Sequence, residues 1–164
     1  MRVLGFDPGT ATTGYGVVER NGNRLRHVAH GTIRTPAHQH FALRLKSLFE
    51  EATGLLSSFH PDAVAIEKLF FVQNVTTGIT VAQARGVLAL AAAQAGLPIG
   101  EFSPLEVKNA VVGYGKATKR QVQEMVKILL NLTCVPRPDD AADALALAIC
   151  QIHSSRLPSG ELAR

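Results

Sequence analysis

Four carboxylates stand where the chain turns, and they are the residues best suited to do chemistry: Asp7, Glu67, Asp140 and Asp143. Asp7 and Glu67 each follow a short apolar run, and Asp140 and Asp143 lie three residues apart at the start of an apolar helix. Carboxylates that are close together repel one another unless a cation lies between them. Oxygen ligands without a His or Cys cluster suit Mg²⁺ or Mn²⁺ better than zinc. We therefore expect a divalent-metal site that acts on phosphate.

The elements that must position these carboxylates follow from apolar spacing. Strands are expected at residues 2–7, 14–20, 25–33, 63–66 and 98–102, the first three as an antiparallel meander with a hairpin turn at Asn21-Gly22-Asn23. Helices are expected at 38–59, at 78–95, from a Ser103 N-cap to the break at Gly113, from a Thr118 N-cap to about 132, and at 139–153. This order predicts an α/β domain with a mixed five-stranded sheet flanked by helices.

In such a sheet, ligands collect at the carboxyl ends of parallel strands. If the strands that end at Asp7 and Glu67 are neighbours, both carboxylates lie at one edge, and a helix can bring Asp140 and Asp143 there from one of its faces. We interpret Asp139 as the N-cap of that helix. Asp143 lies among alanines, so its carboxylate needs a partner. Read singly, Asp7 could be the first residue of a turn, and Asp140 a first-turn acid.

The chain of 164 residues has a formal charge of +4, which fits a polyanionic partner without establishing one. Its length fits one domain, expected at residues 1–153 and followed by a flexible C-terminal tail at 154–164. Cations cluster around the break at Gly113 and are expected to contact phosphate: Lys108, Lys116, Lys119 and Arg120. The two cysteines lack metal-ligand spacing and the apolar runs are too short to cross a membrane, so we expect a reduced, cytoplasmic setting.

Several motifs occur in the order that is typical of one known family. They are Gly5-Phe6-Asp7-Pro8-Gly9-Thr10, Ala65-Ile66-Glu67 followed by Phe70-Phe71-Val72-Gln73-Asn74, Gln83-Ala84-Arg85-Gly86, and Pro138-Asp139-Asp140-Ala141-Ala142-Asp143-Ala144-Leu145. In these motifs, over nearly its whole length, the chain resembles the RuvC family of Holliday-junction resolvases. The resemblance implies an RNase H-like fold, a homodimer, and cleavage of four-way DNA junctions with Mg²⁺ or Mn²⁺, two per active site. It also implies a role in homologous recombination and DNA repair beside a branch-migration helicase complex.

The resemblance assigns roles to individual residues. Its four acidic catalytic positions correspond to Asp7, Glu67, Asp140 and Asp143, and its DNA contacts to Phe70, Arg85, Lys108 and Lys119. Phe70 would stack on a base near the exchange point, where stacking contributes ~1–3 kcal/mol per base. The sequence departs from the family pattern at Lys68 and Gln151, and neither change touches the four acids.

On this interpretation the protein is a two-metal endonuclease that makes paired, symmetric nicks in two strands of like polarity. Two cations ~3.5–4 Å apart would activate a water and stabilise the leaving 3′ oxygen. Asp7 is the expected bridging ligand, Glu67 and Asp143 would each hold one metal, and Asp140 would complete the set or orient the water. The nicks should carry 5′-phosphate and 3′-hydroxyl ends.

The helix at 78–95 is apolar almost all round its axis, although one face suffices to cover a sheet. We expect the other face to pack against the same helix of a second chain, since its many small side chains allow a close approach. The alternative is that the C-terminal helices of the same chain cover this face.

Other functions fit parts of the sequence. The stretch from Asp7 to Gly14 is similar to the first phosphate-binding turn of the actin and sugar-kinase group, but that fold needs two such domains and 164 residues leave no room for them. An RNase H-like nuclease that acts on structured RNA is a closer alternative. A non-catalytic DNA-binding module is a third, although four carboxylates would repel phosphate unless metal were bound.

Overall fold

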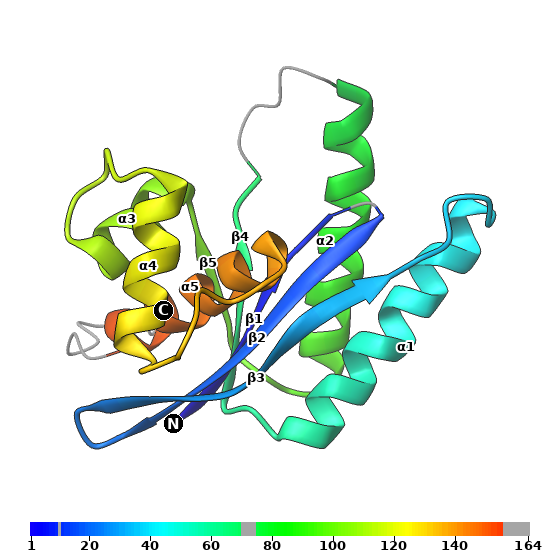
Figure 1. Cartoon of the computed structure of the whole chain (residues 1–164). Coiled ribbons are helices and arrows are strands. Elements are labelled where there is room, and N and C mark those ends of the chain that lie inside the picture. The colour runs from blue at the N-terminus through cyan, green and yellow to red at the C-terminus, as the bar shows by residue number, and fades with distance from the viewer. Residues whose placement is uncertain (10, 70–74, 156–164) are drawn as a thin grey trace, which may run out of the picture.

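The computed structural model describes residues 1–9, 11–69 and 75–155 (Figure 1). In these residues one sheet is formed by β1 (Arg2–Asp7), β2 (Thr12–Asn21), β3 (Arg24–Arg34), β4 (Ala63–Glu67) and β5 (Ile99–Phe102). The strand order is β3-β2-β1-β4-β5, with β2 antiparallel to β1 and β3, and β4 parallel to β1 and β5. The helices are α1 (Phe41–Phe59), α2 (Val75–Gln94), α3 (Pro104–Val112), α4 (Lys119–Leu129) and α5 (Asp139–Ser154). The predicted mixed sheet and its N-terminal meander are confirmed.

The alternation of side chains along the strands separates two cores. Leu4 and Phe6 of β1 are fully buried on the face that α1 and α2 cover, together with Val64 of β4. Val3 and Ala65 point to the opposite face and pack in the core that includes α5. Figure 1 shows the same division, with α1 and α2 on one side of the sheet and α3, α4 and α5 on the other.

Glycines of the two central strands let α5 lie directly on the sheet. A Cβ atom at Gly5 would overlap the carbonyl oxygen of Ala144, and one at Gly14 would overlap that of Asp140. Gly16 is equally close to the backbone of α5. The close approach follows from the missing side chains, and it sets how near the first turn of α5 comes to the end of β1.

The predicted helix starts hold for α3 and α4, where Ser103 and Thr118 are N-caps in capping boxes. The N-cap interpretation of Asp139 is wrong. Pro138 occupies that position with an extended backbone and makes no side-chain cap bond. Asp139 is the first helical residue, and its carboxylate accepts a hydrogen bond from Arg137 at 2.6 Å. The carboxylate of Asp139 is therefore bonded to the guanidinium of Arg137 and not to the N–H groups of the first helical turn.

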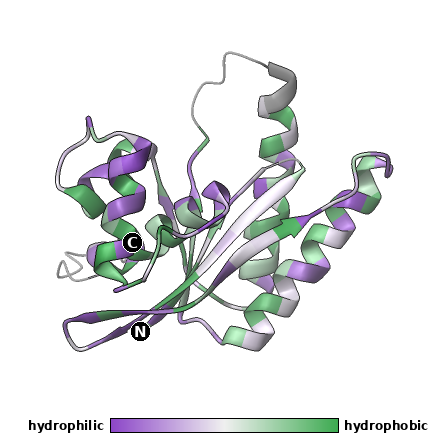
Figure 2. Cartoon of the chain, viewed as in Figure 1, coloured by the Kyte–Doolittle hydropathy of each residue, from purple (hydrophilic) through white to green (hydrophobic). Residues whose placement is uncertain are grey.

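Helix α2 is covered on only one side. Ala84 and Leu88 are buried against α1 and the sheet, whereas Ile79 and Leu90 have 53% and 52% of their surface exposed. Figure 2 shows hydrophobic segments along this helix. The alternative in which the C-terminal helices cover the open side is wrong for these residues, because α3, α4 and α5 lie across the sheet from α2 (Figure 1).

The C-terminal boundary is only partly visible. Ser154, where we expected the tail to begin, is the last residue of α5, and most of the predicted tail lies outside the described residues. A search of the described helices finds none with the length and apolar character that a membrane crossing requires.

Candidate active site

Asp7 and Glu67 lie side by side at one edge of the sheet. The parallel pairing of β1 and β4 sets Phe6 opposite Ile66, so the next residues of both strands are neighbours at the strand ends. Phe6 and Ile66 point toward α1 and α2, and by alternation Asp7 and Glu67 point toward α5. The predicted meeting of these two carboxylates at one edge is confirmed.

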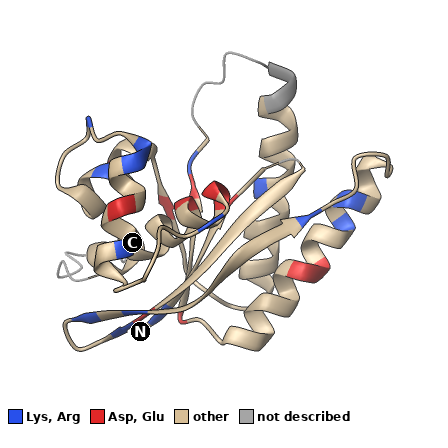
Figure 3. Ribbon diagram, in the orientation of Figure 1, with Lys and Arg blue, Asp and Glu red and all other residues tan. Residues whose placement is uncertain are grey.

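Helix α5 brings the other two carboxylates to this edge. Asp140 and Asp143 line a cavity of about 380 Å³ together with Asp7 and Glu67. Helices α3 and α4 supply further walls, including Lys108 and Lys119. Figure 3 shows acidic positions at the start of α5 close to basic positions on α3 and α4. Six of the predicted site residues therefore share one cavity.

Burial and mutual repulsion make these carboxyl groups hard to ionise together. Burial, followed by the charges of Glu67, Asp143 and Asp140, raises the pKa of Asp7 to about 8. Burial and the charge of Asp143 raise the pKa of Glu67 above its usual range. Burial also raises the pKa of Asp143, although Lys119 opposes the shift. Full ionisation of the group therefore requires added positive charge.

Lys119 supplies part of that charge. Its Nζ lies 2.8 Å from Oδ2 of Asp143 and 3.9 Å from Oδ2 of Asp139. Burial alone would lower the pKa of Lys119, but its hydrogen bond to Asp143 and the neighbouring negative charges outweigh this and raise it. Lys119 is thus the partner that Asp143 was expected to need.

The donor set fits a hard divalent cation. It consists of four carboxylates from β1, β4 and α5, with no histidine or cysteine lining the cavity. Within the described residues, no group of three or more His, Cys, Asp or Glu side chains is arranged so that it could hold a metal ion directly. One of the four carboxylates, Asp143, is instead paired with Lys119. Rotations of the side chains would be needed to bring the four carboxylates to ligand distance.

The other predicted DNA contacts fall in different places. Lys108 is half-buried in the cavity wall, whereas Lys116 and Arg120 are exposed to solvent and do not line the cavity. Arg120 borders an adjoining hollow that also includes Lys119 and Arg137. Phe70 lies outside the described residues.

Arg85 is engaged inside the protein. Its Nε donates a hydrogen bond to the backbone carbonyl of Glu67 at 3.2 Å, and its guanidinium forms an ion pair with Glu101 of β5. It therefore ties α2 to the ends of two strands, one of which carries a candidate catalytic acid.

The sequence reasoning missed the glycines that seat α5. The signal was present in Gly14-Tyr15-Gly16, because glycine inside a strand often marks a close backbone approach. It also missed the pairing of Lys119 with Asp143, which joins two different helices across the cavity.

Comparison with known proteins gives consistent results. A family model described as "Crossover junction endodeoxyribonuclease RuvC" matches residues 3–151. The chain is 55% identical over 159 residues to the crossover junction endodeoxyribonuclease RuvC of Syntrophomonas wolfei, covering 97% of this chain and 92% of that one. Identity to the protein of the same name from Rubrobacter xylanophilus is 57% over 155 residues, covering 94% and 87%.

Among solved structures, the fold matches Thermus thermophilus RuvC in complex with a Holliday junction substrate. The TM-score is 0.91 at 34% identity, with 95% of each chain covered. The yeast mitochondrial Holliday junction resolvase Ydc2, at 15% identity and a TM-score of 0.64, shares the fold.

Carboxylates gathered at the ends of adjacent parallel strands in a β3-β2-β1-β4-β5 sheet define the class of RNase H-like nucleases. Within that class the chain belongs to the RuvC family of crossover junction endodeoxyribonucleases. The family and the fold expected from the motifs are confirmed.

Proposed function

We propose that this protein resolves four-way DNA junctions by hydrolysing phosphodiester bonds, and that Asp7, Glu67, Asp140 and Asp143 form its metal-binding catalytic centre. Its membership of the RuvC family makes the activity that of a crossover junction endodeoxyribonuclease. The observation that carries the residue assignment is the single cavity lined by all four carboxylates and by Lys108 and Lys119.

The electrostatics of the cavity support metal-assisted chemistry. With its pKa near 8, Asp7 resists ionisation unless cations offset the surrounding carboxylates. Two Mg²⁺ or Mn²⁺ ions held there would activate a water and stabilise the leaving 3′ oxygen, giving 5′-phosphate and 3′-hydroxyl ends. Asp7 has all three other acids among its neighbours and is the proposed bridging ligand, with Glu67 and Asp143 on either side and Asp140 completing the set.

The cations around the cavity would hold the DNA. Lys108 and Lys119 lie in its wall and would contact the phosphates next to the cut, while Lys116 and Arg120 would hold phosphates farther along. Phe70 would stack on a base near the exchange point. Arg85 would reach DNA only after leaving Glu101, so its proposed contact depends on that exchange.

The open side of α2 supports the proposed homodimer. Ile79 and Leu90 leave apolar surface exposed on a helix whose opposite side is already packed. The same helix of a second chain would cover it in an isologous interface and pair two catalytic cavities on one junction. A branch-migration helicase partner and a cytoplasmic setting remain predictions from the resemblance and the composition.

Asp7→Asn tests the catalytic assignment. The variant should lose cleavage of a synthetic four-way junction by about 10³-fold, because several kcal/mol of transition-state stabilisation depend on the metal site. Junction binding should persist, since the substitution also removes a charge that repels phosphate. Nicks are mapped on a denaturing gel, and binding is measured separately without divalent metal.

Duplex DNA, an RNA hairpin and ATP serve as substrate controls. Near-normal nicking by Asp7→Asn with Mg²⁺ would refute the metal-site assignment. Faster cleavage of the RNA hairpin than of the junction by the unaltered protein would favour the structured-RNA alternative.

A further inference from the structure

Lys119 brings a positive charge directly onto one of the candidate catalytic carboxylates. Its Nζ lies 2.8 Å from Oδ2 of Asp143, and its charge also acts on Asp7 and Glu67. Within the described residues, no other Lys or Arg side chain forms an ion pair with the four candidate catalytic carboxylates. One ammonium group is therefore bound to a carboxylate that the proposed metal ions need as a ligand.

The position of Lys119 in its own helix does not explain this charge. Lys119 is the first residue of α4, directly after the N-cap Thr118, and Arg120 is the second. The helix dipole disfavours cations at a helix N-terminus, and the first turn of α4 contains no acidic residue that would offset them. The partner of Lys119 comes instead from α5, so the pair belongs to the catalytic cavity and not to the local sequence.

Lys119 also lines the adjoining hollow, which encloses about 520 Å³. Arg120 and Arg137 line this hollow together with Glu124 and Asp139, and the carboxylate of Asp139 is already bonded to Arg137 at 2.6 Å. The three cations outnumber the two acids. The hollow therefore suits a phosphate group of DNA once Lys119 is directed into it.

The side chain of Lys119 can exchange between the catalytic cavity and the adjoining hollow. It is 54% exposed, whereas the side chain of Asp143 is 31% exposed and belongs to a helix whose following residues are buried. The four-carbon stem of lysine is flexible, so Nζ can leave Asp143 while the backbone of α4 stays in place. Such an exchange moves Lys119 and leaves Asp143 in the catalytic cavity.

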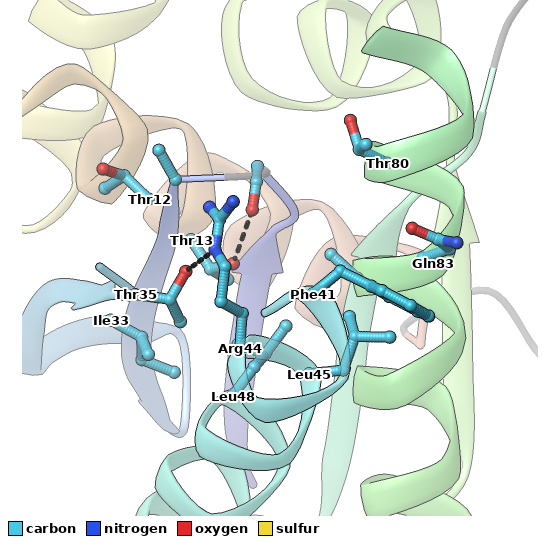
Figure 4. Close-up of a pocket in the computed structure, with 13 residues that line it drawn as sticks. Thr12, Thr13, Ile33, Thr35, Phe41, Arg44, Leu45, Leu48, Thr80 and Gln83 are labelled. Carbon is cyan, nitrogen blue, oxygen red and sulfur yellow. Dashed lines mark hydrogen bonds between the residues drawn. The ribbon is translucent and has the colours of Figure 1, made fainter. Parts of the chain in front are cut away.

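Arg44 of α1 is a contrasting case of a cation that the fold holds in place. Its Nε donates a hydrogen bond to Oγ1 of Thr35 at 3.0 Å (Figure 4). The cavity that it lines, between α1, α2 and the start of β2, encloses only about 50 Å³, and none of the four candidate catalytic carboxylates lines it. Lys119, in contrast, lines two cavities that are each several times larger.

We propose that Lys119 holds the place of a metal ion at Asp143 in the metal-free protein, and that it moves to a DNA phosphate in the adjoining hollow when a metal ion binds. The inference rests on the proposed function, because it concerns the same metal site and the same DNA. Two cations on one carboxylate repel each other, so Lys119 and a metal ion compete for Asp143. Metal binding and junction binding should then strengthen each other by the same factor. The competing explanation is that the ion pair only ties α4 to α5 and stays closed.

The first experiment measures Mn²⁺ binding by calorimetry without DNA. Lys119→Gln should bind Mn²⁺ about tenfold more tightly than the unaltered protein, because no ion pair has to open. Arg120→Gln is the control for a general loss of positive charge, since Arg120 forms no ion pair with a described carboxylate. Its effect should be about twofold or less. No gain in Lys119→Gln, or an equal gain in both variants, would overturn the proposal.

Lys119→Arg tests the exchange in the opposite direction, and it keeps the charge if Lys119→Gln fails to fold. A guanidinium holds a carboxylate through two parallel hydrogen bonds, so it should leave Asp143 less readily than an ammonium group does. Mn²⁺ should therefore bind this variant more weakly than the unaltered protein. Equal or tighter binding would contradict the exchange.

Asp7→Asn in the same assay separates this inference from the proposed function. If Asp7→Asn binds Mn²⁺ normally, the metal site itself is wrongly assigned. If Asp7→Asn loses Mn²⁺ binding while both Lys119 variants bind as the unaltered protein does, the metal site stands and only the exchange is refuted.

The second experiment measures junction binding against salt concentration, once with chelator and once with Ca²⁺, which accepts the same oxygen ligands as Mg²⁺. A denaturing gel confirms that no nicks form. With chelator, the unaltered protein and Lys119→Gln should have the same slope of log affinity against log salt. With Ca²⁺, the slope of the unaltered protein should be steeper by about 1, as expected for one added phosphate contact. The same difference between the two proteins in both conditions would show that Lys119 does not move.

Discussion

Helices α5 and α2 are both rich in small apolar residues and both pack on the sheet, yet their surroundings differ. From Ala141 to Ile152 almost every residue of α5 is buried, because the sheet covers one side and α3 and α4 cover the other. Helix α2 buries Ala84 and Leu88 but exposes Ile79 and Leu90. Similar composition therefore has two outcomes, a core element in one case and a half-covered surface in the other.

The difference separates two tasks. Full coverage fixes α5, so that its first turn holds Asp140 and Asp143 at the ends of β1 and β4. The open side of α2 leaves apolar surface that the proposed second chain would cover, while Arg85 on its inner side bonds to the backbone of Glu67. Changes at α5 should therefore affect catalysis within one chain, and changes on the open side of α2 should affect assembly.

The largest effect is expected where α5 touches the strands. Gly14→Ala places a methyl group against the backbone of Asp140, so the first turn of α5 must move away from the sheet. We expect a loss of ~1–3 kcal/mol in the free energy of unfolding, the range for overpacked sites, and cleavage reduced far more than junction binding. Thermal denaturation and the nicking assay measure the two effects.

Gly54→Ala is the matched control for that substitution. Gly54 lies within α1, and a Cβ atom there would meet no atom within 4 Å. Alanine is the better helix former, so this variant should gain ~0.5–1 kcal/mol. If Gly14→Ala also left stability and cleavage intact, close seating of α5 would not be what positions the acids.

A substitution on the open side of α2 should change the oligomeric state and leave the stability of the chain nearly unchanged. Leu90→Glu adds a charge to exposed surface, so the melting temperature at low protein concentration should change little. The sedimentation coefficient should fall to that of a monomer, and junctions should be nicked once rather than resolved. Ile128→Glu on α4, where 66% of the residue is exposed, should remain dimeric. An unchanged dimer in Leu90→Glu would place the interface elsewhere.

The raised pKa of Asp7, at the end of β1, predicts a pH dependence of stability in the absence of metal. Because the pKa of Asp7 is raised from 3.8 to about 8 by folding, its proton stabilises the folded state below pH 4, and this contribution is lost as the pH rises through 8. The melting temperature in chelator should therefore fall by a few degrees between about pH 5 and 8.5.

Asp7→Asn isolates this effect from other titrating groups. His27, whose pKa is lowered by burial and by His30, acts in the opposite direction near its own pKa and is retained in the variant. The difference between the two melting curves should therefore grow with pH, and Mg²⁺ should abolish it. A constant difference across the range would contradict the raised pKa of Asp7.

The smallest expected effect is a change in the salt dependence of junction binding, measured for one cation on each side of the sheet. Lys108→Gln, in the catalytic cavity, should lower the salt slope of junction binding by about 1. Arg85→Gln should change it less, because Glu67 and Glu101 already engage the Arg85 guanidinium. Equal decreases would show that Arg85 turns from Glu101 to DNA phosphate, as the family resemblance implies.

Local patterns sufficed for most of the secondary structure. The hairpin turn at Gly22, with φ of 60°, and the capping box of Ser103 and Glu106 depend on neighbouring residues and were predictable for that reason. Asp139 shows where the same reasoning fails. Its residue type suits an N-cap, but the charge of Arg137 draws its carboxylate away from the helix N–H groups.

By itself the sequence determined the family, the order of the elements and the four carboxylates that meet at Asp7, since these are recorded in residue types, spacing and periodicity. Only the tertiary structure decided how those charges are balanced and which helix stays half-covered. The pairing of Lys119 with Asp143, the seat of α5 on Gly14 and the cavity around Arg44 all join segments that are separate elements of the chain. Such contacts depend on the distances between packed elements, which no local pattern specifies.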